Sequence, residues 1–250
     1  MFQLNNMHNK DKVLNRLYRA VELYGELGFE YLPLKRADIE ALLTRSGNAS
    51  DTYSEPVAYE ETVARSEGEI DELKALRAKI WDCQRCGLSE NRNNIVFGEG
   101  SPDADIMFIG EGPGRDEDLQ ARPFVGKAGQ LLNNLIVKLD LKREDVYIAN
   151  IIKCRPPNNR DPEDDEAASC RPFIEEQIDI IKPKVIVCLG RVATQALLKV
   201  KTPISKMRGD FFHYNAIPVM PTFHPAYLLR NPKDKWLTWD DMQKVLKKLK

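Results

Sequence analysis

The sequence predicts an α/β fold in which a mainly parallel sheet is covered by helices on both faces. Short apolar runs alternate with stretches of helical periodicity from residue 105 to the C-terminus, and right-handed crossovers make such strands parallel. The run Val185–Leu189 is apolar throughout, as expected of a strand buried on both faces. The apolar run Phe108-Ile109 ends in Gly-Glu-Gly-Pro-Gly, residues 110–114, and glycine-rich turns at strand ends are frequent ligand sites in such sheets.

Each element has its own signal. Strands are predicted where apolar runs are bounded by turn residues, and helices where apolar residues recur every three or four positions. The predicted strands are 105–109, 145–151, 184–189 and 216–223, and the predicted helices are 67–80, 127–139, 162–181, 191–199 and 235–248. The four strands then run in the same direction, and their carboxyl ends meet at one edge of the sheet.

The first 66 residues differ in character from the rest. Helical spacing of apolar residues predicts one helix over 9–27, and residues 37–43 predict a second, shorter one. Residues 44–59 have the polar composition of a solvated linker. We therefore divide the chain into a helical extension with a polar linker, residues 1–66, and an α/β domain, residues 67–250. The extension carries no catalytic motif, and its helices are candidates for docking a protein partner.

Composition limits the class of protein. A chain of 250 residues, 42% of them apolar, can bury a sizeable core. No apolar run is long enough to cross a bilayer and the first residues lack the order of a signal peptide, so we expect a cytoplasmic protein without membrane contact. The net charge of −1 gives no overall attraction to nucleic acid, so any DNA contact needs a local basic patch. We expect a monomer.

Three polar side chains follow the predicted strand ends. Glu111 stands in the glycine-rich turn, Asn150 ends the second strand and His224 follows the fourth. Parallel strands would gather them at one edge, the usual place of an active site in an open α/β sheet. The turn lacks the glycine spacing of dinucleotide-binding folds, and Lys127 is not followed by the Ser or Thr of a phosphate-binding loop. The alternative is a turn that only reverses the chain.

The five cysteines favour metal or cluster ligation over disulfides. Cys83 and Cys86 form a C-x2-C pair, whereas fifteen residues separate Cys154 from Cys170. Zinc modules usually offer two tight pairs, so a cluster is plausible, but spacing alone does not choose between zinc and a 4Fe-4S cluster. Ordinary reduced thiols are the remaining alternative. Cys188 lies inside an apolar strand and is predicted to be a core residue.

These motifs, in this order, resemble those of the iron-sulfur uracil-DNA glycosylases, usually called family 4. The resemblance runs from about Cys83 to the C-terminus and leaves residues 1–66 outside it. The motifs are the C-x2-C pair, Gly-Glu-Gly-Pro-Gly at 110–114, Arg-Pro-Phe-Val-Gly at 122–126, Tyr-Ile-Ala-Asn-Ile-Ile-Lys-Cys-Arg-Pro-Pro at 147–157, Cys170, and His-Pro-Ala-Tyr-Leu-Leu-Arg at 224–230. The resemblance implies a three-layer α/β/α sandwich with a four-stranded parallel sheet.

The resemblance implies both a cofactor and a substrate. Four cysteines would hold a structural 4Fe-4S cluster: Cys83, Cys86, Cys154 and Cys170. The substrate would be uracil-containing DNA, single- or double-stranded, whose uracil nucleotide swings out into the pocket at the strand ends. Hydrolysis of its N-glycosidic bond would release uracil and leave an abasic site, without strand cleavage.

The resemblance also gives roles to residues that match the family's motifs. Phe124 would stack on the base, Asn150 would hydrogen-bond its edge, and His224 would lie near its O2. The chemistry agrees, because an amide offers an acceptor to N3–H and a donor to O4, which matches uracil and mismatches cytosine. A histidine N–H aimed at O2 would stabilise the negative charge that develops on the departing base.

The glycine-rich turn is expected to form one wall of the pocket. Gly110 and Gly112 would let base and sugar approach the backbone closely, and Glu111 would stabilise the cationic sugar or orient the attacking water. In a related family an aspartate activates water at the position of Gly112, which makes Glu111 the substitute candidate here. Gly114 has no side chain with which to exclude thymine.

Basic residues near the same edge are expected to contact DNA. Lys153, Arg155 and Arg160 follow the second strand, and Arg230 follows the last one; each is a candidate phosphate partner. The apolar pair in the segment Tyr227-Leu228-Leu229-Arg230, with Leu228 as the DNA-contacting residue, is a candidate wedge for the gap left by the flipped base. The alternatives are cations that only solvate the surface and a leucine that packs in the core.

We therefore expect a DNA repair glycosylase of base excision repair. Two alternatives stay open: a glycosylase for another deaminated base, and a non-catalytic module in which a cysteine-bound metal supports nucleic-acid binding.

Overall fold

The computed structural model describes residues 67–250. The helices and linker predicted for residues 1–66, the boundary at residue 66 and the partner-docking role of that segment lie outside the described residues. Within residues 67–250, no helix is both long and apolar enough to cross a membrane.

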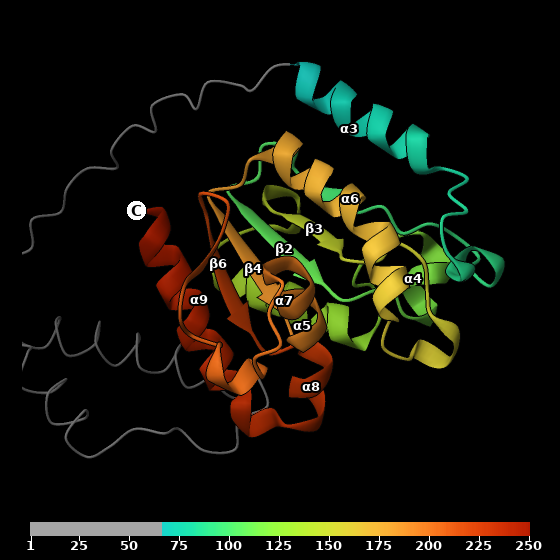
Figure 1. Ribbon diagram of the computed structural model, residues 1–250. Coiled ribbons are helices and arrows are strands. Elements are labelled where there is room, and N and C mark those ends of the chain that lie inside the picture. Colours follow the sequence, from blue (N-terminus) through green and yellow to red (C-terminus); the bar gives the residue numbers. More distant parts are fainter. Residues whose placement is uncertain (1–66) are drawn as a thin grey trace, which may run out of the picture. The chain divides into compact units, whose positions relative to one another are not determined.

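A six-stranded sheet forms the centre of the domain (Figure 1). Its strand order is β1-β3-β2-β4-β6-β5. The strands are β1 (Glu99–Gly100), β2 (Ile106–Gly110), β3 (Tyr147–Asn150), β4 (Val185–Leu189), β5 (Phe212–Tyr214) and β6 (Ile217–Thr222). The central strands β3, β2, β4 and β6 are parallel, and the two edge strands pair antiparallel to their neighbours. The predicted α/β class is confirmed, and its four parallel strands are the middle of the sheet.

The sequence did not predict β1 and β5. They contain two and three residues, too few for a periodic pattern. A turn at Asn215, whose φ is 52°, joins β5 to β6, and asparagine tolerates this left-handed conformation better than most residues. Both strands cover the edges of the parallel core, where unpaired backbone groups would otherwise be exposed.

The five predicted helices are confirmed to within two residues at each end. The helices are α3 (Glu67–Ile80), α4 (Arg115–Gln120), α5 (Lys127–Lys138), α6 (Asp164–Ile181), α7 (Arg191–Leu198), α8 (Pro225–Arg230) and α9 (Lys235–Leu249). The sequence did not predict α4 and α8, which have six residues each.

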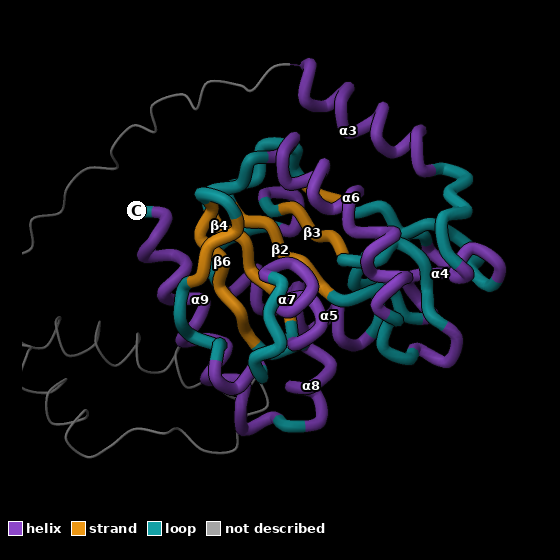
Figure 2. Tube along the Cα trace, viewed as in Figure 1, coloured by secondary structure: helices purple, strands orange, loops and turns teal. Residues whose placement is uncertain are grey.

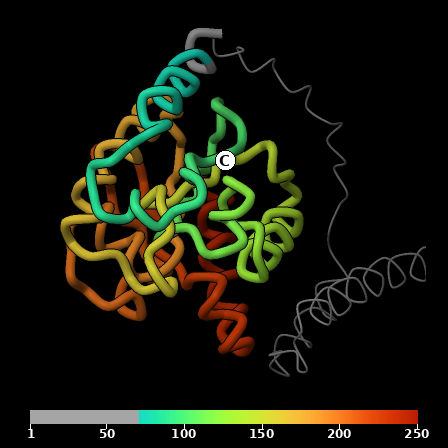
Figure 3. Tube along the Cα trace, turned by 90° about the vertical axis from the view of Figure 1, so that its right-hand side faces the viewer, coloured from blue at the N-terminus to red at the C-terminus, as the bar shows by residue number. Residues whose placement is uncertain are grey.

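Side chains of the central strands alternate between two hydrophobic cores. Met107 and Ile109 pack into a core with residues of α3, α6 and α7. Ile106 and Phe108 face the opposite core, with residues of α5 and α9. Figure 2 shows the strands between these helices, and Figure 3 shows α6 and α7 on one side of the sheet and α5 on the other. This is the expected α/β/α sandwich, and it leaves the carboxyl ends of the strands as the accessible edge.

Gly129 provides a test of how closely α5 packs on the loop before it. A Cβ at this position would lie 2.8 Å from Cα of Phe124 and closer still to its carbonyl group. Backbone cannot yield as a side chain can, so Gly129→Ala should lower the free energy of unfolding by about 1–3 kcal/mol, even though alanine favours a helix.

Urea denaturation of the two proteins measures the effect. The matched control is Gly87→Ala, because a Cβ at Gly87 meets nothing within 4 Å and should change stability by no more than about 0.5 kcal/mol. Equal stability of Gly129→Ala and the parent would show that α5 is free to move away from the loop.

Candidate active site

A cleft opens at the sheet edge where the parallel strands end. It encloses about 570 Å³, within the usual size range of small-molecule sites. The lining residues are 111–117, Phe124, 126–128, Asn150, Pro156, Asn159, Arg160, His224, Ala226, Tyr227 and Arg230. The structure therefore brings together Glu111, Gly112, Phe124, Asn150 and His224, which are far apart in sequence.

Gly110 lies directly beneath two walls of this cleft. A Cβ at this position would lie 2.6 Å from Cζ of Phe124 and closer still to Oδ1 of Asn150. At Gly112 a Cβ would lie 2.6 Å from the Ile152 side chain. Both glycines are needed because side chains from other segments occupy the space that a Cβ would fill.

Asn150 lines the cleft, and its side-chain oxygen is buried without a hydrogen-bond partner. The residue is 1% exposed and pairs in register with Gly110 across the parallel strands β2 and β3. Among the described residues, its Oδ1 is the one buried side-chain oxygen or nitrogen without a hydrogen-bond partner. Such an atom costs roughly 1–3 kcal/mol, and on a residue that lines a ligand-sized cleft it is a candidate acceptor for a ligand N–H.

His224 is held as a neutral imidazole that can donate a hydrogen bond. It is the N-cap of α8, where its Nδ1 accepts the backbone N–H of Ala226 at 3.1 Å. Burial, assisted by the positive charge of Arg230, lowers the pKa of His224 to about 4. Because Nδ1 is an acceptor, the proton of the neutral ring is on Nε2. The ring therefore offers one N–H donor without a positive charge.

Phe124 forms a wall of the cleft beside this histidine. It is 5% exposed, and its ring centroid lies 5.7 Å from that of His224. Its φ of 51° is unusual for a bulky residue and must be held by its surroundings. Arg143 contributes by donating to the carbonyl oxygens of Phe124 (3.4 Å) and of the proline before it.

Glu117 joins the two loops that form the cleft. Its carboxylate accepts the backbone N–H groups of Gly114 (3.2 Å), Val125 (2.8 Å) and Gly126 (2.9 Å). Sequence reasoning missed this residue, although a glutamate three residues after the N-cap of a helix is a recognised capping signal. Glu117 fixes the glycine-rich turn against the Phe124 loop.

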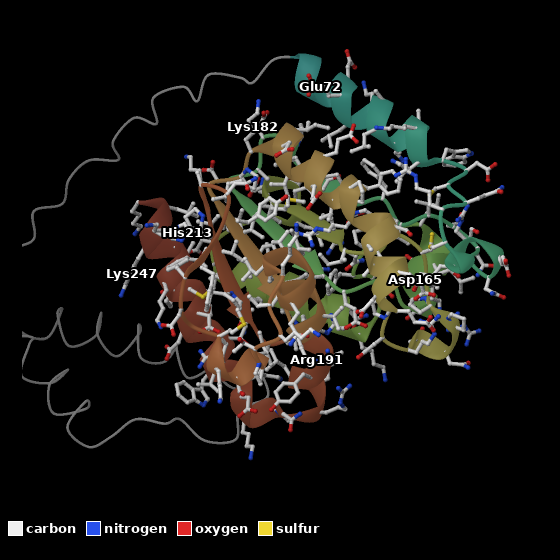
Figure 4. The ribbon with its side chains drawn as sticks, viewed as in Figure 1. Glu72, Asp165, Lys182, Arg191, His213 and Lys247 are labelled. Carbon is white, nitrogen blue, oxygen red and sulfur yellow. The ribbon has the colours of Figure 1, made fainter. Side chains whose placement is uncertain are left out.

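Glu111 is half-buried and has a raised pKa. Burial, assisted by the negative charge of Asp161 and opposed by the positive charge of Arg191, raises the pKa of Glu111 to about 7. Asp161 and Arg191 form an ion pair with each other, and Arg191 begins α7 at the strand-end side of the sheet (Figure 4). Sequence reasoning missed both partners, because they come from segments 30 residues apart.

The four cysteines of the predicted cluster line a second, smaller cavity. It lies between the segment after α3, the loop after β3, and α6, and its walls include Cys83, Cys86, Cys154 and Cys170. Cys188 does not line it and is fully buried in β4. Within residues 67–250, no three His, Cys, Asp or Glu side chains converge closely enough to hold a single metal ion.

Two N–H donors point at the cysteine sulfurs. The backbone N–H of Lys153 donates to Sγ of Cys170 at 3.2 Å, and the guanidinium of Arg92 donates to Sγ of Cys154 at 3.5 Å. Burial raises the pKa of both thiols, that of Cys170 to about 12. Donors of this kind favour sulfur in its anionic form, the form that ligates iron.

Two of the predicted DNA contacts are wrong. Lys153 is 1% exposed and its ammonium is bonded inside the domain, so it cannot reach a phosphate. Leu228 is 4% exposed and belongs to the core, whereas its neighbour Leu229 is 43% exposed. Side-chain direction on the short helix α8 decides which leucine faces outward, and the sequence did not predict that helix.

The three arginines are placed differently from one another. Arg230 is exposed and lines the cleft. Arg160 also lines it, but its guanidinium is paired with Glu166 at 2.7 Å. Arg155 is half-buried and donates to Asn159 at 2.7 Å. Arg230 is therefore the cation of this group with the clearest access to a ligand in the cleft.

Comparison with known proteins gives the class to which this fold and site belong. The sequence profile of the Uracil DNA glycosylase superfamily matches residues 97–250. The matched segment contains all six strands of the sheet and every residue that lines the cleft.

Individual relatives narrow the class further. The chain is 46% identical over 185 residues to a Type-4 uracil-DNA glycosylase of Saccharolobus solfataricus, covering 70% of this chain and 86% of that protein. It is 45% identical over 177 residues to a Type-4 uracil-DNA glycosylase of Thermotoga maritima, covering 69% of this chain and 92% of the relative. The chain therefore belongs to the uracil-DNA glycosylase superfamily, in its type-4 group.

The raised pKa of Glu111 predicts a pH-dependent stability change. A carboxyl group whose pKa is raised on folding stabilises the fold below its ordinary pKa of 4.5, and this contribution is lost as the pH rises through about 7. Glutamine cannot ionise, so Glu111→Gln should not lose stability over this pH range. The variant should match the parent near pH 4.5 and exceed it by about 2 kcal/mol at pH 8.5, after allowance for partial exposure.

Urea denaturation at the two pH values measures the difference. Glu144→Gln is the matched control, since this carboxylate is 77% exposed, and it should leave the pH dependence unchanged. A stability difference for Glu111→Gln that does not vary with pH would contradict the burial of an ionisable carboxyl group.

Proposed function

We propose that the cleft receives a deoxyuridine flipped out of DNA and that the chain hydrolyses its N-glycosidic bond. Membership of the type-4 uracil-DNA glycosylases makes the chain a DNA repair glycosylase, a hydrolase acting on N-glycosyl bonds. The unpaired Oδ1 of Asn150 carries the assignment to this cleft. Uracil presents N3–H and O4 on one edge, and an amide supplies an acceptor and a donor in the matching order. Cytosine, which lacks the N3 proton, would leave this buried oxygen unsatisfied.

Negative charge develops on the base as the bond to the sugar breaks. The Nε2–H of His224 is the donor that would face O2 of the departing uracil. Burial keeps this imidazole neutral. It therefore stabilises the uracil anion by a hydrogen bond from an uncharged N–H, and not as a cation. A preorganised donor of this kind is commonly worth about 3–4 kcal/mol.

Positive charge develops on the sugar at the same time. Glu111 is the carboxylate that would face it, or that would orient the water that adds to C1′. Because its pKa is raised to about 7, Glu111 changes its ionisation state near neutral pH, and in its ionised form it can perform either task. Water supplies a hydroxyl group to the sugar and a proton to the base, so the products are free uracil and an abasic site. No covalent lysine is involved, and the DNA strand stays intact.

The remaining walls and cations would hold the nucleotide and its phosphates. Stacking of the base on Phe124 would replace the stacking lost on flipping, worth roughly 1–3 kcal/mol. Arg230 is positioned as the phosphate contact nearest the cleft, with Arg160 as a second once its ion pair opens. Leu229, rather than Leu228, is the exposed side chain that would fill the gap left in the DNA duplex by the flipped nucleotide. The monomeric state and the cytoplasmic location stay predictions.

We also propose that Cys83, Cys86, Cys154 and Cys170 hold a 4Fe-4S cluster. The fit rests on four thiols around one cavity and on N–H donors to two of the sulfurs. The cluster would have a structural role, since it would link three parts of the chain: the segment after α3, the helix α6, and the loop that follows Asn150. The steps of uracil release are assigned to protein side chains alone.

Excision of uracil tests the function and its residues. An oligonucleotide with one uracil, treated with alkali after incubation, should be cut at that position when the parent protein is added. His224→Ala should lower kcat by about 10²–10³-fold because the donor to O2 is lost, and Asn150→Ala should lower kcat/KM by at least about 10-fold.

The matched control for the histidine is His213→Ala. His213 is exposed on the edge strand β5 and pairs with Pro218, near the amino end of β6 (Figure 4). This variant should excise uracil as the parent does. An iron-containing parent that leaves both single- and double-stranded uracil DNA intact would overturn the proposed function.

Iron analysis tests the cluster separately. The purified parent should be brown and contain about four irons and four acid-labile sulfides per chain, and Cys154→Ser or Cys170→Ser should lose most of both. The control Cys188→Ala should retain them, because Cys188 lies in β4 outside the cavity. A colourless parent with one zinc ion per chain would contradict the cluster.

A further inference from the structure

Lys153 stands between the cleft and the cysteine cavity. It lies in the short segment that joins Asn150, at the end of β3, to Cys154. Its side chain is among the largest that are fully buried in the described part of the chain, and it lines the cavity together with the four cysteines. Full burial of a lysine is rare and calls for a specific reason.

The polar groups of Lys153 reach both sites. Its ammonium donates to the backbone carbonyl of Asn150 at 2.9 Å and to Oε1 of Gln177 at 2.6 Å. Its backbone N–H donates to Sγ of Cys170 at 3.2 Å. Lys153 thus contacts the end of β3, at Asn150, with its side chain and the sulfur of Cys170 with its main chain.

Gln177 is fixed so that it can only accept from the ammonium. Its Nε2 donates to the carbonyl of Phe97 at 3.0 Å and to the hydroxyl of Tyr147 at 3.1 Å. Both donor hydrogens of the amide are thereby used, and Oε1 is left for Lys153. Gln177 is itself 0% exposed and belongs to α6, the helix that also carries Cys170.

Within residues 67–250, the hydrogen-bond partners of the ammonium supply no counter-charge, so its charge depends on the cysteines for balance. The two atoms that accept its hydrogen bonds are a carbonyl and an amide oxygen, neither of them charged. The groups beside it that cluster ligation would make anionic are Cys154, which follows it in the chain, and Cys170, whose Sγ accepts its backbone N–H. A buried cation with no counter-charge is strongly destabilising, whereas cluster ligation would supply several negative charges beside it.

We propose that Lys153 is a positioning residue that couples the two sites: its charge is balanced by the ligating thiolates, and its ammonium fixes the backbone of Asn150 so that the side-chain amide points into the cleft. The inference rests on the proposed function for its effect on excision. It does not require Lys153 to touch the substrate. A lysine that only fills space in the core would contribute to folding but would not act through Asn150.

A double-mutant cycle separates these two roles. Lys153→Met keeps the length of the side chain and removes both hydrogen bonds of the ammonium. In proteins that retain their iron, it should lower kcat/KM for uracil excision by about 10–100-fold, the usual effect of a lost supporting contact. In the Asn150→Ala background, the same change should cost less than about 3-fold, because the residue through which Lys153 acts is already gone. Equal losses in both backgrounds, or no loss in either, would overturn the proposal.

The reduction potential of the cluster gives a readout that does not depend on excision. Removal of a positive charge beside the thiolates should make reduction harder, so Lys153→Met should have a lower potential than the parent. The matched control Lys184→Met removes a lysine that is 57% exposed and paired with Asp105, and it should change neither the potential nor kcat/KM. An unchanged potential in Lys153→Met would refute the charge balance. If the parent binds iron but releases no uracil, the proposed function fails while this measurement still decides the charge balance.

Gln177→Leu keeps the test valid if Lys153→Met loses its iron. This variant retains the ammonium and its charge but removes one of its two acceptors. It should retain the cluster and its potential and lower kcat/KM by about 3–10-fold, again only when Asn150 is present. Full activity of an iron-containing Gln177→Leu protein would overturn the positioning role.

Discussion

The parallel pairing of β2 with β3 is the constraint on which the rest of the site depends. Gly110 and Asn150 are partners in that register, and beyond them the N–H of Ile151 still bonds to the carbonyl of Gly110 at 2.9 Å. The Asn150 amide therefore lies over a residue without a side chain, against the ring of Phe124. A shift of one residue in this register would turn the amide to the other face of the sheet, and no rearrangement of the loops could restore it.

Burial acts on Glu111 and His224, two titratable groups that line the cleft, in opposite directions but to the same effect. It raises the pKa of Glu111 and lowers that of His224, so both groups are driven toward their neutral forms. The neutral forms of these two side chains suit a substrate base that is itself neutral. Charge develops on the substrate as the glycosidic bond breaks, which is when a fixed donor, and Glu111 in its ionised form, stabilise the reacting atoms more than they stabilise the substrate.

The sequence predicted those parts of the site that follow from local pattern and parallel topology. Apolar runs that end in Gly110, Asn150 and Phe223 define strand ends, and parallel strands must bring those ends together. The sequence did not predict which side chains are exposed, since exposure depends on what packs against a side chain from a distant segment. Oε1 of Gln177, in α6, accepts a hydrogen bond from the ammonium of Lys153. This contact allows Lys153 to be buried, although the sequence predicted it to lie at the surface. The ion pair of Asp161 and Arg191, whose charges act on Glu111, likewise joins segments that are far apart in the sequence.

The short link between the two sites has a consequence for how this protein can be altered. Asn150 and Cys154 are separated by only three residues, and each of these is tied down: Ile151 and Ile152 by backbone hydrogen bonds to the first turn, and Lys153 by its contacts in the core. An insertion or deletion here would displace either the amide or the thiol. Between the two sites the chain can therefore be varied only by replacing one side chain with another.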